Sequence, residues 1–317
     1  MGGTLGAVAA ELGRRARLQD DRRRLHPLEC PAGSGWRPSS RRLRFRPRPG
    51  HREPRYPDPV LLAHAVSGAG APVVLLHSGV ADRRMWQPQI PALEHRFRVI
   101  SPDLRGFGES PLPPEDYADA DDLAELLDHL EVVDAAVVGS SMGGRVALEL
   151  ATRHPDRVNS LVLLCPAYRG VPPSAAAEAI DAAEDRLLAA GDVAGAVRLN
   201  VDTWLGPVAG PEVRDQLTAM QRRAFDVQLA AAHQDPAPAK REVTVDPAKV
   251  AVPTVIVTGG LDLDHFQTVG EVLAEEIDGA ELVRLPWAGH LPSMERPDAV
   301  VTLLLDVLRH DPTVHAP

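Results

Sequence analysis

The sequence has 317 residues and a hydrophobic content of 44%, which is ordinary for a globular protein that buries a core. Its formal net charge is −10, and this acidic balance argues against nucleic acid as a main partner. Its two cysteines, Cys30 and Cys165, lie in unlike segments, so neither a disulfide framework nor a zinc site is expected. Because no apolar run approaches the roughly 18 residues of a membrane span, we expect no stable membrane insertion and a cytoplasmic location.

The first 55 residues differ in composition from the rest of the chain. Residues 1–56 hold 14 arginines against 5 acidic residues, so the remainder carries a strong negative charge. From Arg22 to Arg55, Arg, Pro and Gly dominate and no apolar periodicity is visible. We therefore expect residues 1–55 to form a disordered or weakly attached extension. An arginine-rich tail can also bind anionic surfaces, but we favour an extension without function.

Regular patterns begin near Val60. Apolar runs of strand length alternate with stretches whose apolar residues recur at helical spacing, such as Leu123, Leu126, Leu127 and Leu130. This alternation predicts an α/β fold with a mainly parallel, doubly wound sheet, and the near-continuous apolar strands indicate helices on both of its faces. Strands are expected at residues 60–66, 72–76, 98–101, 135–138, 160–164, 254–257 and 281–285, and helices at 82–93 (with Pro88 early in it or breaking it), 121–130, 145–154 and 298–308.

The alternation of strands and helices stops between Ala167 and about Lys249. This stretch is rich in alanine and helical in pattern, and proline-containing segments stand at both of its ends. We interpret residues 167–249 as a helical cap inserted into the chain. Residues 56–166 and 250–317 would then form the core.

The stretch Gly139-Ser140-Ser141-Met142-Gly143 lies between a predicted strand and a predicted helix. In that context the pattern G-x-S-x-G is typical of a nucleophile elbow, a turn so tight that the residues two positions either side of the serine must be small. The turn lifts the serine hydroxyl out of the sheet. The competing interpretation is a serine at an ordinary turn between a strand and a helix.

A serine hydroxyl becomes a competent nucleophile only with a base within hydrogen-bond reach and an acid that orients the base. Asp262 follows the predicted strand 254–257, and His290 follows the last predicted strand. Together with Ser141, both lie at the carboxyl ends of predicted parallel strands, where open α/β sheets bind ligands. Asp264 is an alternative acid, although the spacing after Gly259 favours Asp262.

From about Val60 to His310, the chain resembles the α/β-hydrolase fold family, which also has the order Ser, Asp, His in its catalytic triad. The elbow and the tail from Gly289 to Pro297 resemble small carboxylesterases and enol-lactone hydrolases. The resemblance implies a serine hydrolase that cleaves an ester or lactone and needs no metal or organic cofactor. Carbon–carbon bond hydrolases share the Ser-Met-Gly-Gly elbow and stay an alternative, as does a non-catalytic ligand-binding protein on the same scaffold. The motifs that carry the resemblance are residues 75–79, 103–110, 139–143, 259–262 and 289–290.

The resemblance also implies an oxyanion hole made of two backbone N–H groups. One donor is the N–H of Met142, directly after the nucleophile. The other comes from the loop after Leu76, where the family usually has His-Gly-x and this chain has His77-Ser78-Gly79-Val80. The second donor is therefore Gly79 by alignment, or Val80 if the loop shifts, while His77 is expected to be structural.

The remaining candidates are substrate contacts. Asp103 and Arg105 could clamp a substrate, although in the family this segment mostly braces the loop beside the active site. Trp204, within the predicted cap, is the favoured pocket wall. The substrate is expected to be a small molecule, and the sequence leaves its acyl and alcohol groups and the oligomeric state open. The other aromatic residues considered as pocket walls are Trp86, Phe225 and Trp287.

Overall fold

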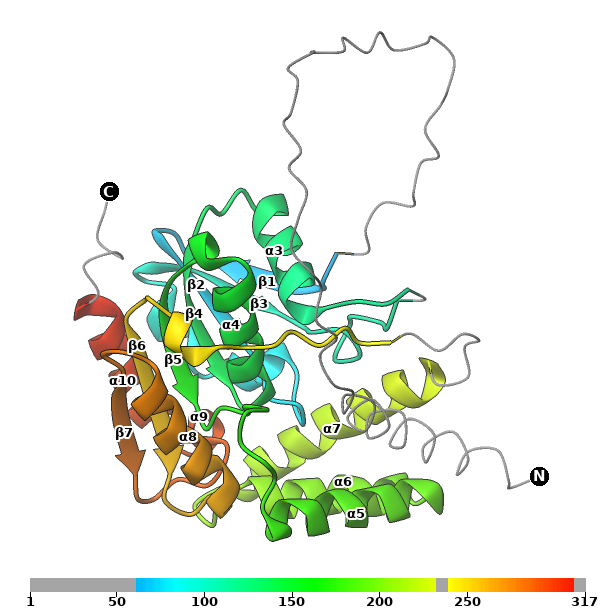
Figure 1. Cartoon of the computed structure of the whole chain (residues 1–317). Helices are drawn as coiled ribbons and strands as arrows, with labels where there is room; N and C mark the ends of the chain where they lie inside the picture. The colour runs from blue at the N-terminus through cyan, green and yellow to red at the C-terminus, as the bar shows by residue number, and fades with distance from the viewer. Residues whose placement is uncertain (1–60, 114, 232–238, 311–317) are drawn as a thin grey trace, which may run out of the picture.

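The computed structural model describes residues 61–113, 115–231 and 239–310, and one sheet lies at the centre of this part of the chain (Figure 1). Its strands are hydrogen-bonded in the order β1-β3-β2-β4-β5-β6-β7, with β1 antiparallel to β3 and every other neighbouring pair parallel. The predicted mainly parallel sheet is confirmed. The predicted extension, residues 1–55, lies outside the described residues. The strands are β1 (His64–Ser67), β2 (Ala71–Leu76), β3 (Phe97–Pro102), β4 (Ala135–Ser140), β5 (Val158–Leu164), β6 (Thr254–Gly259) and β7 (Glu281–Leu285).

Alternate residues of the central strands contribute to two separate apolar cores. Val74 and Leu76 pack with three helices on one face of the sheet, whereas Val73 and Leu75 belong to the core on the other face. Successive side chains of a strand point to opposite faces, so a strand that is apolar throughout must be covered on both sides. The first face is covered by α3 (Asp119–His129), α4 (Met142–Arg153) and α8 (Asp264–Glu276), and the second by α10 (Pro297–His310).

The predicted helix at residues 82–93 is interrupted in the structure. The chain forms a 3-10 turn, η2 (Arg83–Trp86), and resumes after Pro88 as the single turn α2 (Ile90–Leu93). Proline has no backbone N–H and its ring clashes with the preceding turn, which explains the break. Trp86 is fully buried and Phe225 is largely buried, and both pack in the second core. Three further short turns are η3 (Pro155–Arg157), η4 (Pro247–Lys249) and α9 (Pro292–Glu295).

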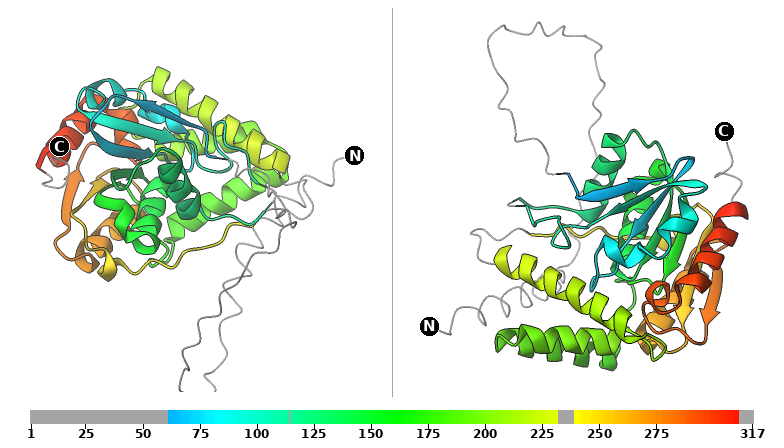
Figure 2. Two further views of the ribbon diagram at one scale, coloured as in Figure 1. Left: turned by 90° about the horizontal axis from the view of Figure 1, so that it is seen from above. Right: turned by 180° about the vertical axis from the view of Figure 1, so that it is seen from behind.

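Three longer helices occupy the sequence between β5 and β6, namely α5 (Ala175–Ala189), α6 (Val193–Trp204) and α7 (Pro211–Ala231). They lie across the end of the sheet to which the strand arrows point, as Figures 1 and 2 show from three directions. The carboxyl ends of parallel strands meet there, at the edge where open α/β sheets bind ligands. The helical character expected of residues 167–249 is therefore present, while the domain limits themselves stay a prediction. Within the described ranges, every helix is too short or too polar to cross a bilayer.

Candidate active site

Ser141 lies on the turn between β4, the middle strand of the sheet, and α4. Its φ is 51° and its ψ is −111°, a conformation that non-glycine residues rarely adopt and that indicates local strain. A Cβ atom added to Gly139 would collide with the carbonyl of Gly143, and one added to Gly143 would collide with the carbonyl of Leu76. The backbone segments therefore approach each other so closely that only glycine fits, as the elbow pattern predicts.

Backbone hydrogen bonds tie the elbow to the neighbouring strand ends. The N–H of Ser141 donates to the carbonyl of Leu164 at the end of β5, at 2.9 Å. The N–H of Leu261, after β6, donates to the carbonyl of Ala288, after β7, at 2.8 Å. The loops that carry Ser141, Asp262 and His290 are thus fixed to the same edge of one sheet.

Asp262 and His290 are directly hydrogen-bonded. The distance between His290 Nδ1 and Asp262 Oδ2 is 2.7 Å, and their side chains are 3% and 2% exposed. Asp264, the alternative acid, instead accepts a hydrogen bond from the Ser174 hydroxyl at 2.7 Å. A proton on Nδ1 that is shared with a carboxylate leaves Nε2 as the unprotonated ring nitrogen, which is the arrangement of an oriented base.

Two aromatic rings pack against the imidazole of His290. The ring of Trp204 lies 4.7 Å from it between centroids, and that of Phe266 lies 4.1 Å from it. The indole Nε1–H of Trp204 donates to Asn200 at 2.7 Å, which fixes the orientation of the ring. Trp204 was the favoured pocket wall, whereas Phe266 was not singled out. The feature of the sequence that could have identified Phe266 is its position in the first turn of the helix that follows Asp262.

A buried carboxylate braces the loop that carries the histidine. Glu295 Oε2 accepts the N–H of Gly289 at 2.8 Å, and Oε1 accepts the N–H of Leu291 at 3.2 Å. These are the residues on either side of His290. The sequence places Glu295 in the resembling tail but assigns it no role, because the tail pattern does not show that the carboxylate turns back onto backbone N–H groups four and six residues earlier.

Cys165 is buried beneath the same pair. Its ligand atom and those of Asp262 and His290 lie within 4.8 Å of one another, which makes them the one candidate metal-ligating trio among the described residues. Burial raises the pKa of the Cys165 thiol, and a protonated thiol is a poor metal ligand. Asp262 and His290 already satisfy each other, so the trio fits a hydrogen-bonded cluster better than a metal site. That no cofactor is required stays a prediction.

The two expected oxyanion donors are neighbours in space. A Cβ atom on Gly79 would lie 3.6 Å from the side chain of Met142. Among the hydrogen bonds of the described residues, none uses the N–H of Gly79 or of Met142. Two free N–H groups next to the elbow could bind a developing oxyanion. The choice between Gly79 and Val80 stays a prediction.

The other polar candidates hold loops together. His77 Nε2 accepts the N–H of Leu104 at 2.9 Å, and burial lowers the pKa of this imidazole, which keeps it neutral. Asp103 accepts the backbone N–H groups of Arg83 at 2.8 Å and of Glu109 at 2.9 Å. Arg105 pairs with a carboxylate of α3. These contacts fit the bracing interpretation rather than a substrate clamp.

The comparison with known proteins agrees with this architecture. Residues 71–201 match the family model described as alpha/beta hydrolase fold. A pimeloyl-(acyl-carrier protein) methyl ester esterase of Neisseria meningitidis is 30% identical over 251 residues, which cover 74% of this chain and 92% of that protein. A 2-hydroxymuconate semialdehyde hydrolase of Pseudomonas sp. is 42% identical over 105 residues, but these cover only 31% of this chain and 37% of that protein.

A solved structure extends the likeness to the fold. A thermophilic esterase from Thermogutta terrifontis superposes with a TM-score of 0.65 and 30% sequence identity, covering 80% of this chain and 94% of that one. Both the sequence and the structure are thus shared over nearly the full length of known hydrolases. The chain belongs to the alpha/beta hydrolase fold family and is an enzyme of the hydrolase class.

Proposed function

We propose that this enzyme is a serine hydrolase that cleaves a small carboxylic ester or lactone through an acyl-enzyme. Ser141 is the nucleophile, His290 the general base and Asp262 the acid that orients it. The observation that carries the proposal is the buried hydrogen bond between Asp262 and His290, at the sheet edge where the strained turn of Ser141 also lies. Similarity to two esterases supports ester chemistry.

The reaction has two steps. His290 Nε2 takes the proton of the Ser141 hydroxyl while the oxygen attacks the carbonyl carbon, and the carbonyl electrons move onto the oxyanion. The N–H groups of Met142 and Gly79 stabilise that oxyanion until the intermediate collapses and expels the alkoxide, which His290 protonates. His290 then activates a water that attacks the acyl-enzyme and releases the acid and the free serine.

Asp262 contributes through the imidazole. Its carboxylate holds the proton on Nδ1 and stabilises the imidazolium that forms when His290 takes the serine proton. Trp204 and Phe266 exclude water from the ring, which strengthens these charge interactions.

A labelling experiment with a matched control tests the nucleophile. The native enzyme should react with a fluorophosphonate probe and turn over p-nitrophenyl esters, and Ser141→Ala should lose both. The control is Ser140→Ala, which removes a buried hydroxyl one residue away that has no hydrogen-bond partner among the described residues. Ester turnover by Ser141→Ala at the native rate would refute the proposal.

Carbon–carbon bond hydrolysis is the second candidate. It is favoured by the 42% identity to the semialdehyde hydrolase over 105 residues. Comparing kcat/KM for a dienol diketone with kcat/KM for a p-nitrophenyl ester and for a lactone separates the two activities.

A further inference from the structure

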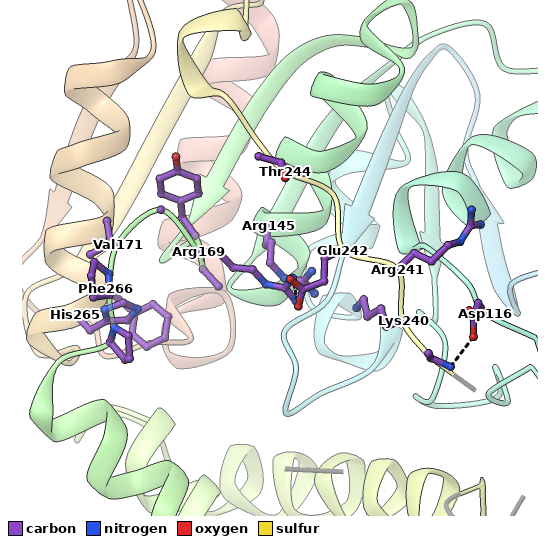
Figure 3. Close-up of a pocket in the computed structure, with 16 residues that line it drawn as sticks. Asp116, Arg145, Arg169, Val171, Lys240, Arg241, Glu242, Thr244, His265 and Phe266 are labelled. Carbon is purple, nitrogen blue, oxygen red and sulfur yellow. Dashed lines mark hydrogen bonds and ion pairs between the residues drawn. The ribbon is translucent and has the colours of Figure 1, made fainter. Parts of the chain in front are cut away.

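A cavity of approximately 1290 Å³ opens beside the candidate active site (Figure 3). Three segments form most of its wall. They are residues 167–173 after β5, residues 239–242 and 244 after α7, and the first turn of α8. At one end lies Phe266, whose ring packs on His290 at 4.1 Å between centroids. Phe266 is therefore shared by the surroundings of the proposed base and the wall of the cavity, while Ser141, Asp262 and His290 are not themselves among the lining residues.

More cationic than acidic side chains line the cavity, and each of the cations is paired with a carboxylate, from Asp119, Asp121, Glu149 or Glu242. Four cationic side chains line it, against two acidic ones, in a protein whose net charge is −10. Figure 3 shows Arg145, Arg169 and Glu242 meeting near the middle of the wall, with Lys240 beside them. The cationic side chains are Arg145, Arg169, Lys240 and Arg241, and the acidic ones are Asp116 and Glu242.

The inner part of this wall is a desolvated ionic cluster. One carboxylate oxygen of Asp119 faces both Lys240 and, at 3.6 Å, Arg145, while Glu149 accepts from Arg145 at 2.6 Å. The carboxylate of Asp119 is only 1% exposed to solvent, so its charge is stabilised by these cations and not by water. Burial lowers the pKa of Lys240, because the ammonium has lost much of its water. An anion bound in the cavity would replace part of the hydration that the Lys240 ammonium has lost.

The outer part of the wall holds a cation that can exchange partners. Arg169 pairs with Glu242, and both side chains are exposed, at 45% and 61%. Exposed ion pairs contribute little free energy, so such a guanidinium can turn to a ligand at small cost. A guanidinium can bind a carboxylate through two parallel hydrogen bonds.

We propose that this cavity is a subsite for a carboxylate that the ester substrate carries at the end remote from its scissile bond. Arg169 and Lys240 contact the carboxylate, and the scissile carbonyl lies at Ser141. The inference rests on the proposed function, since it names the class of ester on which that site acts.

The test compares isosteric esters that differ only in the remote group. On the acyl side, the p-nitrophenyl monoester of adipic acid is compared with that of its monoamide. On the alcohol side, the acetate ester of 6-hydroxyhexanoic acid is compared with that of 6-hydroxyhexanamide. In at least one series kcat/KM should favour the carboxylate by about tenfold, the effect expected of a hydrogen bond to a charged group.

Substitutions in the cavity wall identify the side chains that cause the preference for a carboxylate. The ratio of carboxylate to amide kcat/KM should fall toward one in Arg169→Gln and in Lys240→Gln. It should stay native in Arg222→Gln, a control on α7 that removes an exposed arginine paired with Asp226 away from the cavity wall. If Lys240→Gln fails to fold, Arg169→Gln still decides, because its ion pair is exposed on both sides.

A binding measurement separates this inference from the proposed function. Adipate, followed by titration calorimetry, should bind the native protein and bind Arg169→Gln about tenfold more weakly. If Ser141 is not labelled and no ester is hydrolysed, the proposed function fails, and adipate binding still decides the subsite. If esters are hydrolysed without a carboxylate preference in either series, and Arg169→Gln leaves adipate binding unchanged, the subsite alone is refuted.

Discussion

The indole of Trp204 lies across the imidazole of His290, with ring centroids 4.7 Å apart and planes inclined at 45°. Trp204 ends α6, between β5 and β6, whereas His290 follows β7. The hydrogen bond from Trp204 to Asn200 fixes the indole, so the cover over the imidazole is itself held in place. A helix far away in the sequence therefore sets the surroundings of the proposed base.

Removing the indole should slow ester hydrolysis without unfolding the protein. Trp204→Ala exposes the imidazole to water, and kcat/KM should fall by up to about tenfold, in line with the worth of an aromatic pair. Trp204→Phe keeps a ring and should lose less. Trp287→Ala serves as the control, because that indole packs on Arg296 at 4.8 Å and not on His290. A native rate in Trp204→Ala would contradict the prediction.

The two nearby aspartates should respond very differently to the loss of charge. Asp262→Asn keeps the shape of the side chain but no longer stabilises an imidazolium, so kcat should fall by roughly 10³ to 10⁴. Asp264→Asn changes a residue that accepts from Ser174 instead, and should stay near the native rate. Steady-state kinetics with a p-nitrophenyl ester measures both. Equal losses in the two variants would exclude Asp262 as the specific partner of His290.

Glu295 should matter for both stability and rate. Glu295→Gln replaces one of two acceptors with an NH₂ group that faces a backbone N–H, which should lower the free energy of unfolding by about 1–3 kcal/mol. Because the two N–H groups flank His290, kcat should fall more than KM rises. Urea denaturation and steady-state kinetics give the two readouts. Glu281→Gln, at an exposed position at the start of β7, is the control, and a loss of the same size there would remove the special role of Glu295.

The stability of the helices over the sheet edge should depend on pH through Glu184. Burial raises the pKa of Glu184, although a hydrogen bond from Asn200 opposes the shift. A raised pKa in the folded state means that the group favours folding fully below its unfolded pKa of about 4.3, and that this contribution is lost as pH rises through the folded pKa. Glu184→Gln should therefore gain stability over the native protein near pH 8 but not near pH 4.

Chemical denaturation at the two pH values measures this difference. Glu178→Gln lies exposed on the same helix and makes the same change in charge, so it is the matched control. A gain in Glu184→Gln that is equal at both pH values would show that burial of the charge is not its cause.

The parts of the site that follow from local chain geometry could be predicted from the sequence. Gly139 and Gly143 are required by one tight turn, and the position of Asp262 is set by the end of β6, so spacing was sufficient for both. The predicted helix at 82–93 was only half right, because the pattern did not decide whether Pro88 ends it.

Contacts between distant segments could not be predicted in this way. The ring of Phe266, on the helix after β6, packs on His290, which follows β7, and this contact leaves no pattern in sequence spacing. The ionic cluster joins Asp119, Arg145 and Lys240 from three separate parts of the chain. Only the folded arrangement shows that these charges neighbour one another and line a cavity.

The helices α5 to α7 enter the chain after the serine and leave it before the acid and the histidine. Their length and composition can therefore drift during evolution while the strand ends keep their register. Yet Trp204, one of the rings that pack on the imidazole of His290, belongs to α6. A change in α6 would therefore alter the ring that packs on the imidazole and, with it, the hydration around the proposed base.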